Sequence, residues 1–381
     1  MKSFCKFFRK QRKNNERKRI NKQVFIALKG MKLMQFNRED HPHRRCNPLT
    51  GSWVLVSPHR TKRPWSGQIE KIAQEDKPEY DPTCYLCPGN LRAGGFENPK
   101  YSATYSFVND FSALLADTPF GGEDDFFFRT ESVRGICKVL IFSPSHCLTL
   151  PLMSQAEVTQ VAQMWQREYL ELSVLPDINY VQIFENKGAV MGCSNPHPHG
   201  QIWASQSIPE EIVKKCTSQA DYIAKHQRPL LIDYVEQELK KDERVIFCND
   251  SFVVLVPFWA VWPYEAMILP RRQMSSIANF TPKELELLAE AVRVLTIKYD
   301  NLFETSFPYS AGMHQMPTDG KEYPGFTWHM IFYPPLLRSA TIRKFMVGYE
   351  LLAEPQRDIT PEASAAKLKE LPLTHYLTKS S

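Results

Sequence analysis

Two histidines separated by a single proline stand in the segment 195–203, which reads N-P-H-P-H-G-Q-I-W. Imidazole is a nucleophile at neutral pH without further activation, and it is also the commonest zinc ligand among side chains. Pro196 and Pro198 stiffen the backbone on either side of the first ring. If the segment is extended, His197 and His199 project to the same side. A surface His-Pro turn is the alternative interpretation of these residues taken alone.

A second group with ligand chemistry is Cys84-Tyr-Leu-Cys87, whose spacing is used for tetrahedral zinc. The sequence has no second C-x-x-C, so two ligands must come from elsewhere, and His146 and His197 are the candidates. A closed Cys2His2 set would be structural, because no coordination position remains for a substrate. A metal on His197 would anchor the segment that carries His199. A redox pair or chance spacing is the alternative.

Groups that could bind phosphate flank these residues in the sequence. The segment 59–65 (H-R-T-K-R-P-W) is the densest basic cluster in the body of the chain, and an arginine fork pairs with two phosphate oxygens. A solvated loop is the alternative. A turn predicted at 185–188 and the stretch 192–194 supply small residues and backbone donors, as a phosphate cradle requires.

The elements that position these residues can be read from caps and periodicity. A capping box at Ser154–Glu157 and the apolar spacing after it predict an amphipathic helix over 154–173. Alternation predicts a strand at 180–184, and the His-Pro-His segment leads into another strand at 201–205.

The second half of the chain repeats this order. A capping box at Thr281–Glu284, with proline at the first helical position, predicts a helix to about residue 298, and a later strand spans 328–333. Glu157 lies 42 residues before His199, and Glu284 lies 45 before His329. This spacing indicates internal duplication of an α+β unit, in which only the first copy keeps both histidines.

Composition is that of a soluble globular enzyme, with 43% hydrophobic and 23% charged residues. The longest apolar run, 252–262, is too short to cross a membrane. The nine cysteines are an odd number and follow no secretory signal, which favours reduced thiols and a cytoplasmic location.

The net charge of +5 arises at the front of the chain. Residues 1–30 hold 11 Lys/Arg and one acidic residue, so the other 36 basic and 41 acidic residues give the body a net charge of −5. We interpret 1–30 as a disordered extension, with Met31 and Met34 as possible translation starts. A nucleic-acid arm or an organelle presequence is the alternative.

Six ordered motifs together resemble the galactose-1-phosphate uridylyltransferase family, a branch of the histidine-triad superfamily. They lie at 41–50, 57–65, 84–89, 184–203, 299–310 and 334–350. The resemblance implies an α+β fold in which two histidine-triad-like repeats form a half-barrel antiparallel sheet with flanking helices. We expect an N-terminal half, 31–208, with the zinc site and nucleophile, and a C-terminal half, 209–381, with the hexose-phosphate motif.

The family reaction transfers UMP from UDP-glucose to galactose 1-phosphate and gives UDP-galactose and glucose 1-phosphate. By this resemblance His199 is the nucleophile that carries a covalent uridylyl group in a ping-pong mechanism, and Gln201 hydrogen-bonds the transferring phosphoryl group. The implied substrate-binding residues are Arg60, Arg63, Asn109, Asp110, Asn186, Gly192, Cys193, Ser194, Gln201, Lys344, Phe345, Tyr349, Glu350 and Gln356.

The resemblance also implies one structural zinc ion per chain, on Cys84, Cys87, His146 and His197. The implied assembly is a homodimer in which residues 344–356 reach the hexose phosphate across the interface.

Some family members hold a second, iron-type site of one glutamate and three histidines. Here the carboxylate position falls on Lys215, His314 and His329 persist, and the third histidine is Ile331. A cation in place of an anionic ligand predicts that this second site is absent.

Two other function classes remain as alternatives. An ADP-sugar phosphorylase or a histidine-triad nucleotide hydrolase would use the same nucleophile. A zinc-dependent nucleic-acid binder is disfavoured by the acidic body and the single C-x-x-C, and no membrane association is expected.

Overall fold

The computed structural model describes residues 35–62 and 77–379. The basic segment 1–30 and Arg63 lie outside the described residues. Contacts divide the chain into Met1–His41 and Pro42–Ser381, and every described helix and strand lies in the second unit. The second unit contains residues 42–208 of the predicted N-terminal half and the whole of the predicted C-terminal half.

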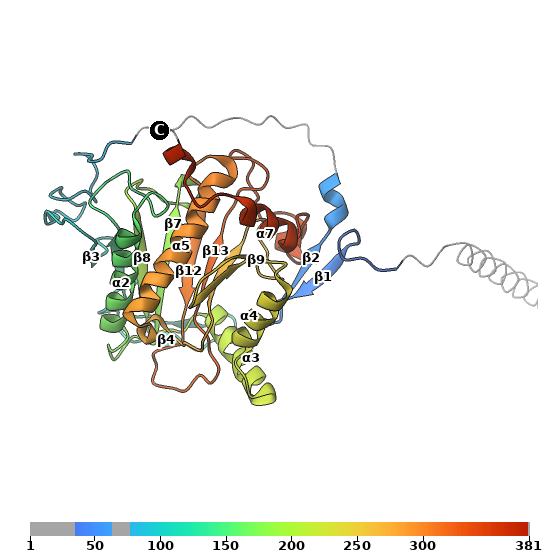
Figure 1. Cartoon of the computed structure of the whole chain (residues 1–381). Coiled ribbons are helices and arrows are strands. Elements are labelled where there is room, and N and C mark those ends of the chain that lie inside the picture. The colour runs from blue at the N-terminus through green and yellow to red at the C-terminus, as the bar shows by residue number, and fades with distance from the viewer. Residues whose placement is uncertain (1–34, 63–76, 380–381) are drawn as a thin grey trace, which may run out of the picture. The chain divides into compact units, whose positions relative to one another are not determined.

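The centre of the fold is a nine-stranded sheet in which every neighbouring pair is antiparallel (Figure 1). In spatial order its strands are β3 (Tyr105–Val108), β6 (Gly135–Ile141), β8 (His199–Ser205), β7 (Tyr180–Lys187), β12 (Tyr309–His314), β13 (His329–Tyr333), β11 (Ala266–Pro270), β10 (Phe252–Leu255) and β9 (Val245–Cys248).

The strand order confirms the expected duplication. From the central β7–β12 pair, the first repeat runs outward through β8, β6 and β3, and the second runs outward through β13, β11 and β10. The histidine-bearing strands β8 and β13 occupy equivalent places. The antiparallel α+β fold with two repeats is thus confirmed.

Two smaller sheets, six α-helices and four short 3-10 helices complete the described part of the chain. A three-stranded sheet joins β1 (His43–Cys46), β2 (Trp53–Val56) and β14 (Gln356–Arg357), and a hairpin joins β4 (Gly122–Glu123) and β5 (Thr130–Glu131). The helices are α2 (Gln155–Leu172), α3 (Glu210–His226), α4 (Leu230–Lys241), α5 (Pro282–Phe303), α6 (Tyr349–Leu352) and α7 (Pro361–Glu370).

Both predicted capping boxes are present. The Ser154 hydroxyl accepts from the backbone N–H of Glu157 at the start of α2, and Thr281 and Glu284 are arranged in the same way at the start of α5. Such a cap contributes about 1 kcal/mol to helix stability. α5 runs to Phe303, five residues beyond the predicted end, because its last turns stay buried. The two helices pack side by side on one face of the sheet (Figure 1).

Alternation along the strands divides the core between the two faces. In β10, Phe252 and Val254 face the main cluster beneath α2 and α5, whereas Val253 and Leu255 face a second cluster beneath α4. The second repeat is thus covered on both faces, which explains why β10 and β11 are entirely buried.

The outer face of β7 and β8 differs in chemistry. Its residues are half-buried or exposed, and most are polar. They are Gln182, Phe184 and Asn186 on β7, and His199, Gln201 and Trp203 on β8. Polar side chains on a face next to a packed core are the feature expected of a binding site rather than of packing.

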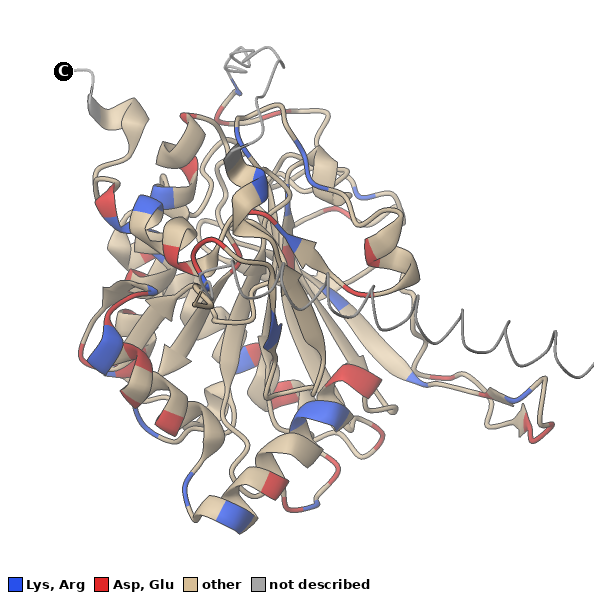
Figure 2. Cartoon of the chain, turned by 90° about the vertical axis from the view of Figure 1, so that its right-hand side faces the viewer, with Lys and Arg blue, Asp and Glu red and all other residues tan. Residues whose placement is uncertain are grey.

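No described helix is long and apolar enough to span a bilayer. In the view of Figure 2, Lys and Arg are interspersed with Asp and Glu along the described helices and loops.

Candidate active site and metal centre

Four predicted ligands come together in one buried group. The donor atoms of Cys84, Cys87, His146 and His197 all lie within 4.8 Å of one another. The Cys87 Sγ lies 3.6 Å from His146 Nδ1 and 3.5 Å from His197 Nδ1. Sulfur and nitrogen at these separations fit a single tetrahedral cation with metal–ligand bonds of about 2.0–2.3 Å. The set predicted from the sequence is therefore assembled, and its donor chemistry suits zinc.

The surroundings orient these ligands. His197 Nε2 lies 2.8 Å from the carbonyl of Ser143, so this nitrogen carries the proton and Nδ1 faces the thiols. The Asn195 side chain contacts Cys84 Sγ at 3.5 Å and accepts from the His197 N–H. Burial raises the pKa of the Cys87 thiol to about 11, so a bound cation would be needed to keep it as thiolate.

Two asparagines missed by the sequence analysis hold the cysteine loop. Asn90 donates to the carbonyls of Asp81 and Cys84, and Asn98 donates to the carbonyls of Tyr85 and Cys87. The only signal in the sequence is the nearness of two asparagines to C-x-x-C, which is too common to select them. Cys84, Leu86 and Cys87 pack with Val139 and Ile141 of β6, beside the strand that carries His199.

The predicted nucleophile has a defined tautomer. His199 Nδ1 lies 2.7 Å from the carbonyl oxygen of His197, and a carbonyl can only accept, so Nδ1 carries the proton. Nε2 is then the nitrogen with a free lone pair. Burial lowers the pKa of His199 below its usual 6.5, which favours the neutral nucleophilic ring. His197 lies in a bend, and β8 begins at His199, so the extended geometry considered for this pair is absent.

A close approach explains the glycine between the two catalytic candidates. A Cβ on Gly200 would lie 2.9 Å from Phe142 Cζ and 3.0 Å from the Phe184 carbonyl. Strand alternation places His199 and Gln201 on the same face, on either side of this tight contact.

The substrate-binding candidate Asn186 lies on β7, the strand next to the one that carries Gln201. Phe184 of β7 is opposite Gln201, and Asn186 is two residues further along the same face. Asn186 Oδ1 accepts from the Ser310 hydroxyl at 2.7 Å. The strand β7 extends to Lys187, so the turn predicted at 185–188 is wrong, and only Gly188, with φ +88°, has the left-handed backbone of a turn.

Asn109 and Asp110 directly follow β3, which is the edge strand of the sheet on the side of the first repeat. The Asn109 N–H donates to the Cys137 carbonyl, and its side chain accepts from the Phe111 N–H at 3.0 Å. Asp110 pairs with the half-buried Arg92 at 3.5 Å. The stretch Gly192–Ser194 lies in the loop between β7 and β8, with Gly192 and Ser194 exposed and Cys193 half-buried.

The substrate-binding candidates between residues 344 and 356 form a second group. Lys344 Nζ lies 2.7 Å from Glu350, Arg357 contacts the other oxygen of Glu350 at 3.2 Å, and the Gln356 amide donates to Asp358 at 2.7 Å. Phe345 and Tyr349 are exposed in this group, which lies along the chain from 344 to 358.

Arg60 belongs with this second group. The Arg60 Nε lies 3.0 Å from Asp358. Arg60 lies in the short helix Pro58–Lys62, which follows β2, and β2 pairs in parallel with β14, the strand directly before Asp358. Beyond β9, the outer strand of the second repeat, lies the β1–β2 ribbon with α7 beside it, whereas β8 lies near the opposite edge of the sheet (Figure 1). One chain therefore does not bring Arg60 to His199.

The lysine at the iron-type position lies against both remaining histidines of that site. Lys215 Nζ lies 2.5 Å from His314 Nδ1 and 3.3 Å from His329 Nε2, and Glu211 is 3.6 Å away. Burial lowers the pKa of Lys215 to about 8. Both rings can accept a hydrogen bond from the Lys215 ammonium, so this one internal cation donates to two neutral histidines.

Comparison with known proteins gives a consistent result over the whole body. A family profile described as the N-terminal domain of galactose-1-phosphate uridyl transferase matches residues 34–209, and one described as its C-terminal domain matches 215–380. The galactose-1-phosphate uridylyltransferase of Haemophilus influenzae is 51% identical, with 90% of this chain and 97% of that protein covered. The Saccharomyces cerevisiae protein of the same name is 49% identical, with 92% and 100% covered.

Solved structures agree on the fold. A structure described as uridylyltransferase matches with a TM-score of 0.68 at 25% identity and covers 86% of this chain and 97% of its own. An ADP-glucose phosphorylase from Arabidopsis thaliana with bound ADP-glucose matches with a TM-score of 0.69 at 21% identity, with 87% and 99% covered. At that identity the second likeness concerns the fold alone.

Proposed function

This chain belongs to the galactose-1-phosphate uridylyltransferase family, and on that premise we propose that it transfers UMP from UDP-glucose to galactose 1-phosphate through a uridylyl group on His199. The observation that carries the proposal is the hydrogen bond from His199 Nδ1 to the His197 carbonyl. It commits one ring nitrogen and leaves Nε2 as the nucleophile, on the same face as Gln201.

The two half-reactions use the same atoms in opposite order. His199 Nε2 attacks the α-phosphorus of UDP-glucose, the bond from that phosphorus to the bridging oxygen breaks, and glucose 1-phosphate leaves. A phosphate oxygen of galactose 1-phosphate then attacks the same phosphorus, the P–N bond breaks, and UDP-galactose is released. Gln201 hydrogen-bonds the non-bridging oxygens while charge redistributes over them.

Intact mass spectrometry tests this reaction directly. Incubation with UDP-glucose alone should add one UMP to the protein, and galactose 1-phosphate should remove it. His199→Ala should gain no mass. UMP that accumulates in solution without an adduct would indicate a hydrolase, and an adduct formed only from ADP-glucose would indicate the phosphorylase alternative.

We infer that the metal held by Cys84, Cys87, His146 and His197 is zinc and that its role is structural. Four protein ligands leave no position for a substrate, and all four residues are buried. The metal would fix the bend at His197, whose carbonyl orients His199. Because the ligands include two thiols and the exposed Cys248 is a free thiol, we place the protein in the reducing cytoplasm.

We also propose that the active unit is a homodimer with two shared sites. Arg60, Lys344, Glu350 and Gln356 form a group away from His199 in the same chain, so a complete site needs one group from each subunit. The segment around α6 supports this arrangement, because Leu351 and Leu352 are 71% and 88% exposed beside Phe345 and Tyr349. Apolar residues exposed together are typical of an interface.

Complementation tests the shared site. His199→Ala and Arg60→Ala should each be inactive alone. Random mixing of their subunits gives about half heterodimers, each with one intact site, so about a quarter of wild-type activity should return. No recovery in proven heterodimers would place Arg60 and His199 in the same chain's site.

A further inference from the structure

Ser310 faces the nucleotide-binding candidate Asn186 across the seam between the two repeats. The two residues are paired in register between β7 and β12, and the Ser310 hydroxyl donates to Asn186 Oδ1 at 2.7 Å. Both side chains are half-buried on the outer face that carries His199 and Gln201. The motif 299–310, which the resemblance singled out without a role, supplies this serine.

The hydrogen bond determines which end of the carboxamide is available. Oδ1 is occupied by the hydroxyl, so the Nδ2 group is the end that can donate to a ligand. Phosphate oxygens, like the carbonyl oxygens of a pyrimidine base, only accept hydrogen bonds. The observed orientation therefore suits the acceptor atoms of a uridine diphosphate, and loss of the hydroxyl would leave Oδ1 without its donor.

The backbone beneath Asn186 is fixed by the residues on either side of it. Glu185 accepts from the Tyr309 hydroxyl at 3.0 Å, and Lys187 Nζ lies 2.8 Å from Asp300. Both pairs are buried on the opposite face of β7, and both partners belong to the same 299–310 motif. Three successive residues of the first repeat are thus each held by the second repeat.

Asp300 is itself oriented by two further contacts. Its Oδ1 accepts from the Phe307 N–H at 2.8 Å, and its Oδ2 lies 3.2 Å from His375 Nε2. The anchor of Lys187 therefore has little freedom to move, which keeps the end of β7 rigid where Asn186 projects.

We propose that Ser310 is a positioning residue for UDP-sugar binding, because it holds the Asn186 carboxamide with Nδ2 directed to the bound nucleotide. This role rests on the proposed function and on the substrate-binding role that the family resemblance implies for Asn186. Through Ser310 the second repeat, which has no His-Pro-His segment of its own, contributes to binding at the first.

A double-mutant cycle tests the proposal. The values of kcat/KM for UDP-glucose are measured for Ser310→Ala, Asn186→Ala and the double variant. We expect Ser310→Ala to lower kcat/KM about 10-fold, as for one lost hydrogen bond to a polar group. Because the serine acts through Asn186, the double variant should equal Asn186→Ala, and Ser310→Thr, which keeps the hydroxyl, should retain most activity.

Tyr309→Phe is the matched control, since it removes a neighbouring hydroxyl that acts on the opposite face. Its effect should add to that of Asn186→Ala. Additive effects of Ser310→Ala and Asn186→Ala, or a Ser310→Ala variant with unchanged kcat/KM, would overturn the positioning role. An Asn186→Ala variant with unchanged kcat/KM would instead refute the nucleotide contact itself. Melting temperatures of all variants identify losses caused by unfolding.

Discussion

His199 donates through Nδ1 to the backbone carbonyl of His197 across 2.7 Å, while the ring of His197 faces the thiol of Cys87. The candidate metal ligand His197 therefore orients the proposed nucleophile through its main chain, and the His197 side chain takes no part in that contact. The two rings have different surroundings because the backbone bends at His197.

Replacement of either histidine should separate these roles. His199→Ala should abolish the UMP adduct and leave one metal per chain, because no ligand changes. His197→Ala should lose the metal and at least about 3 kcal/mol of unfolding free energy, since three buried ligands are left without their cation. Metal analysis and denaturant unfolding check both. Equal metal content in the two variants would show that the roles are misassigned.

Gly200 should tolerate no side chain. In Gly200→Ala the new methyl would lie 2.9 Å from Phe142 Cζ and 3.0 Å from a backbone oxygen. We expect a loss of about 1–3 kcal/mol in stability and a displaced His199 with a markedly lower uridylylation rate. Gly121→Ala is the control, because nothing lies within 4 Å of its Cβ position. A fully active Gly200→Ala variant would show that the strand can shift without cost.

Local signals in the sequence were sufficient to predict the starts of two helices and the four candidate metal ligands. The two capping boxes mark the starts of α2 and α5, because a cap is formed within four residues. The C-x-x-C spacing and two histidines identify Cys84, Cys87, His146 and His197, because cysteine and histidine are rare and their ligand chemistry is specific. The repeat spacing likewise anticipated the equivalent places of β8 and β13.

Contacts between segments that are distant in the chain could not be predicted from local sequence signals. The polar sequence at 185–188 is typical of a turn, yet Glu185 and Lys187 are buried strand residues, because Tyr309 and Asp300 supply their partners from the other repeat. Arg60 similarly pairs with Asp358, almost 300 positions later, through β14. Nothing near position 60 indicates that pairing.

Lys215 should make the iron-type site independent of metal. The wild-type protein should bind one metal per chain, and Cys87→Ser should lower this toward zero. Lys215→Met should leave the metal content unchanged and cost about 2 kcal/mol of stability, because His314 and His329 lose the donor that both contact. Two metal equivalents in the wild type would contradict the assignment of Lys215 as the internal cation.

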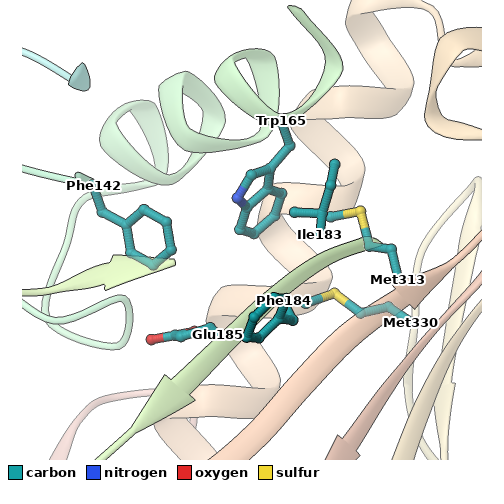
Figure 3. Close-up of a pocket in the computed structure, with 7 residues that line it drawn as sticks. All are labelled: Phe142, Trp165, Ile183, Phe184, Glu185, Met313 and Met330. Carbon is teal, nitrogen blue, oxygen red and sulfur yellow. The ribbon is translucent and has the colours of Figure 1, made fainter. Parts of the chain in front are cut away.

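Glu185 should make stability depend on pH near neutrality. Glu185 lines a cavity of about 10 Å³ together with six apolar side chains (Figure 3): Phe142, Trp165, Ile183, Phe184, Met313 and Met330. Burial raises the pKa of Glu185 to about 7, against the opposing effects of Lys187 and the Tyr309 hydroxyl. The folded state therefore holds this proton more tightly than the unfolded state does, where the pKa is about 4.5.

The sign of the dependence follows from that difference. Ionisation of Glu185 is penalised only in the folded protein, so stability is lost as the pH rises from about 4.5 to about 7 and is constant above that range. The rise in pKa corresponds to about 3 kcal/mol. In Glu185→Gln, which keeps the shape without the charge, this loss should disappear. The free energy of unfolding of both proteins, measured in urea at pH 5, 6, 7 and 8, should diverge across that window. Parallel curves would mean that Lys187 and Tyr309 already hold Glu185 ionised throughout.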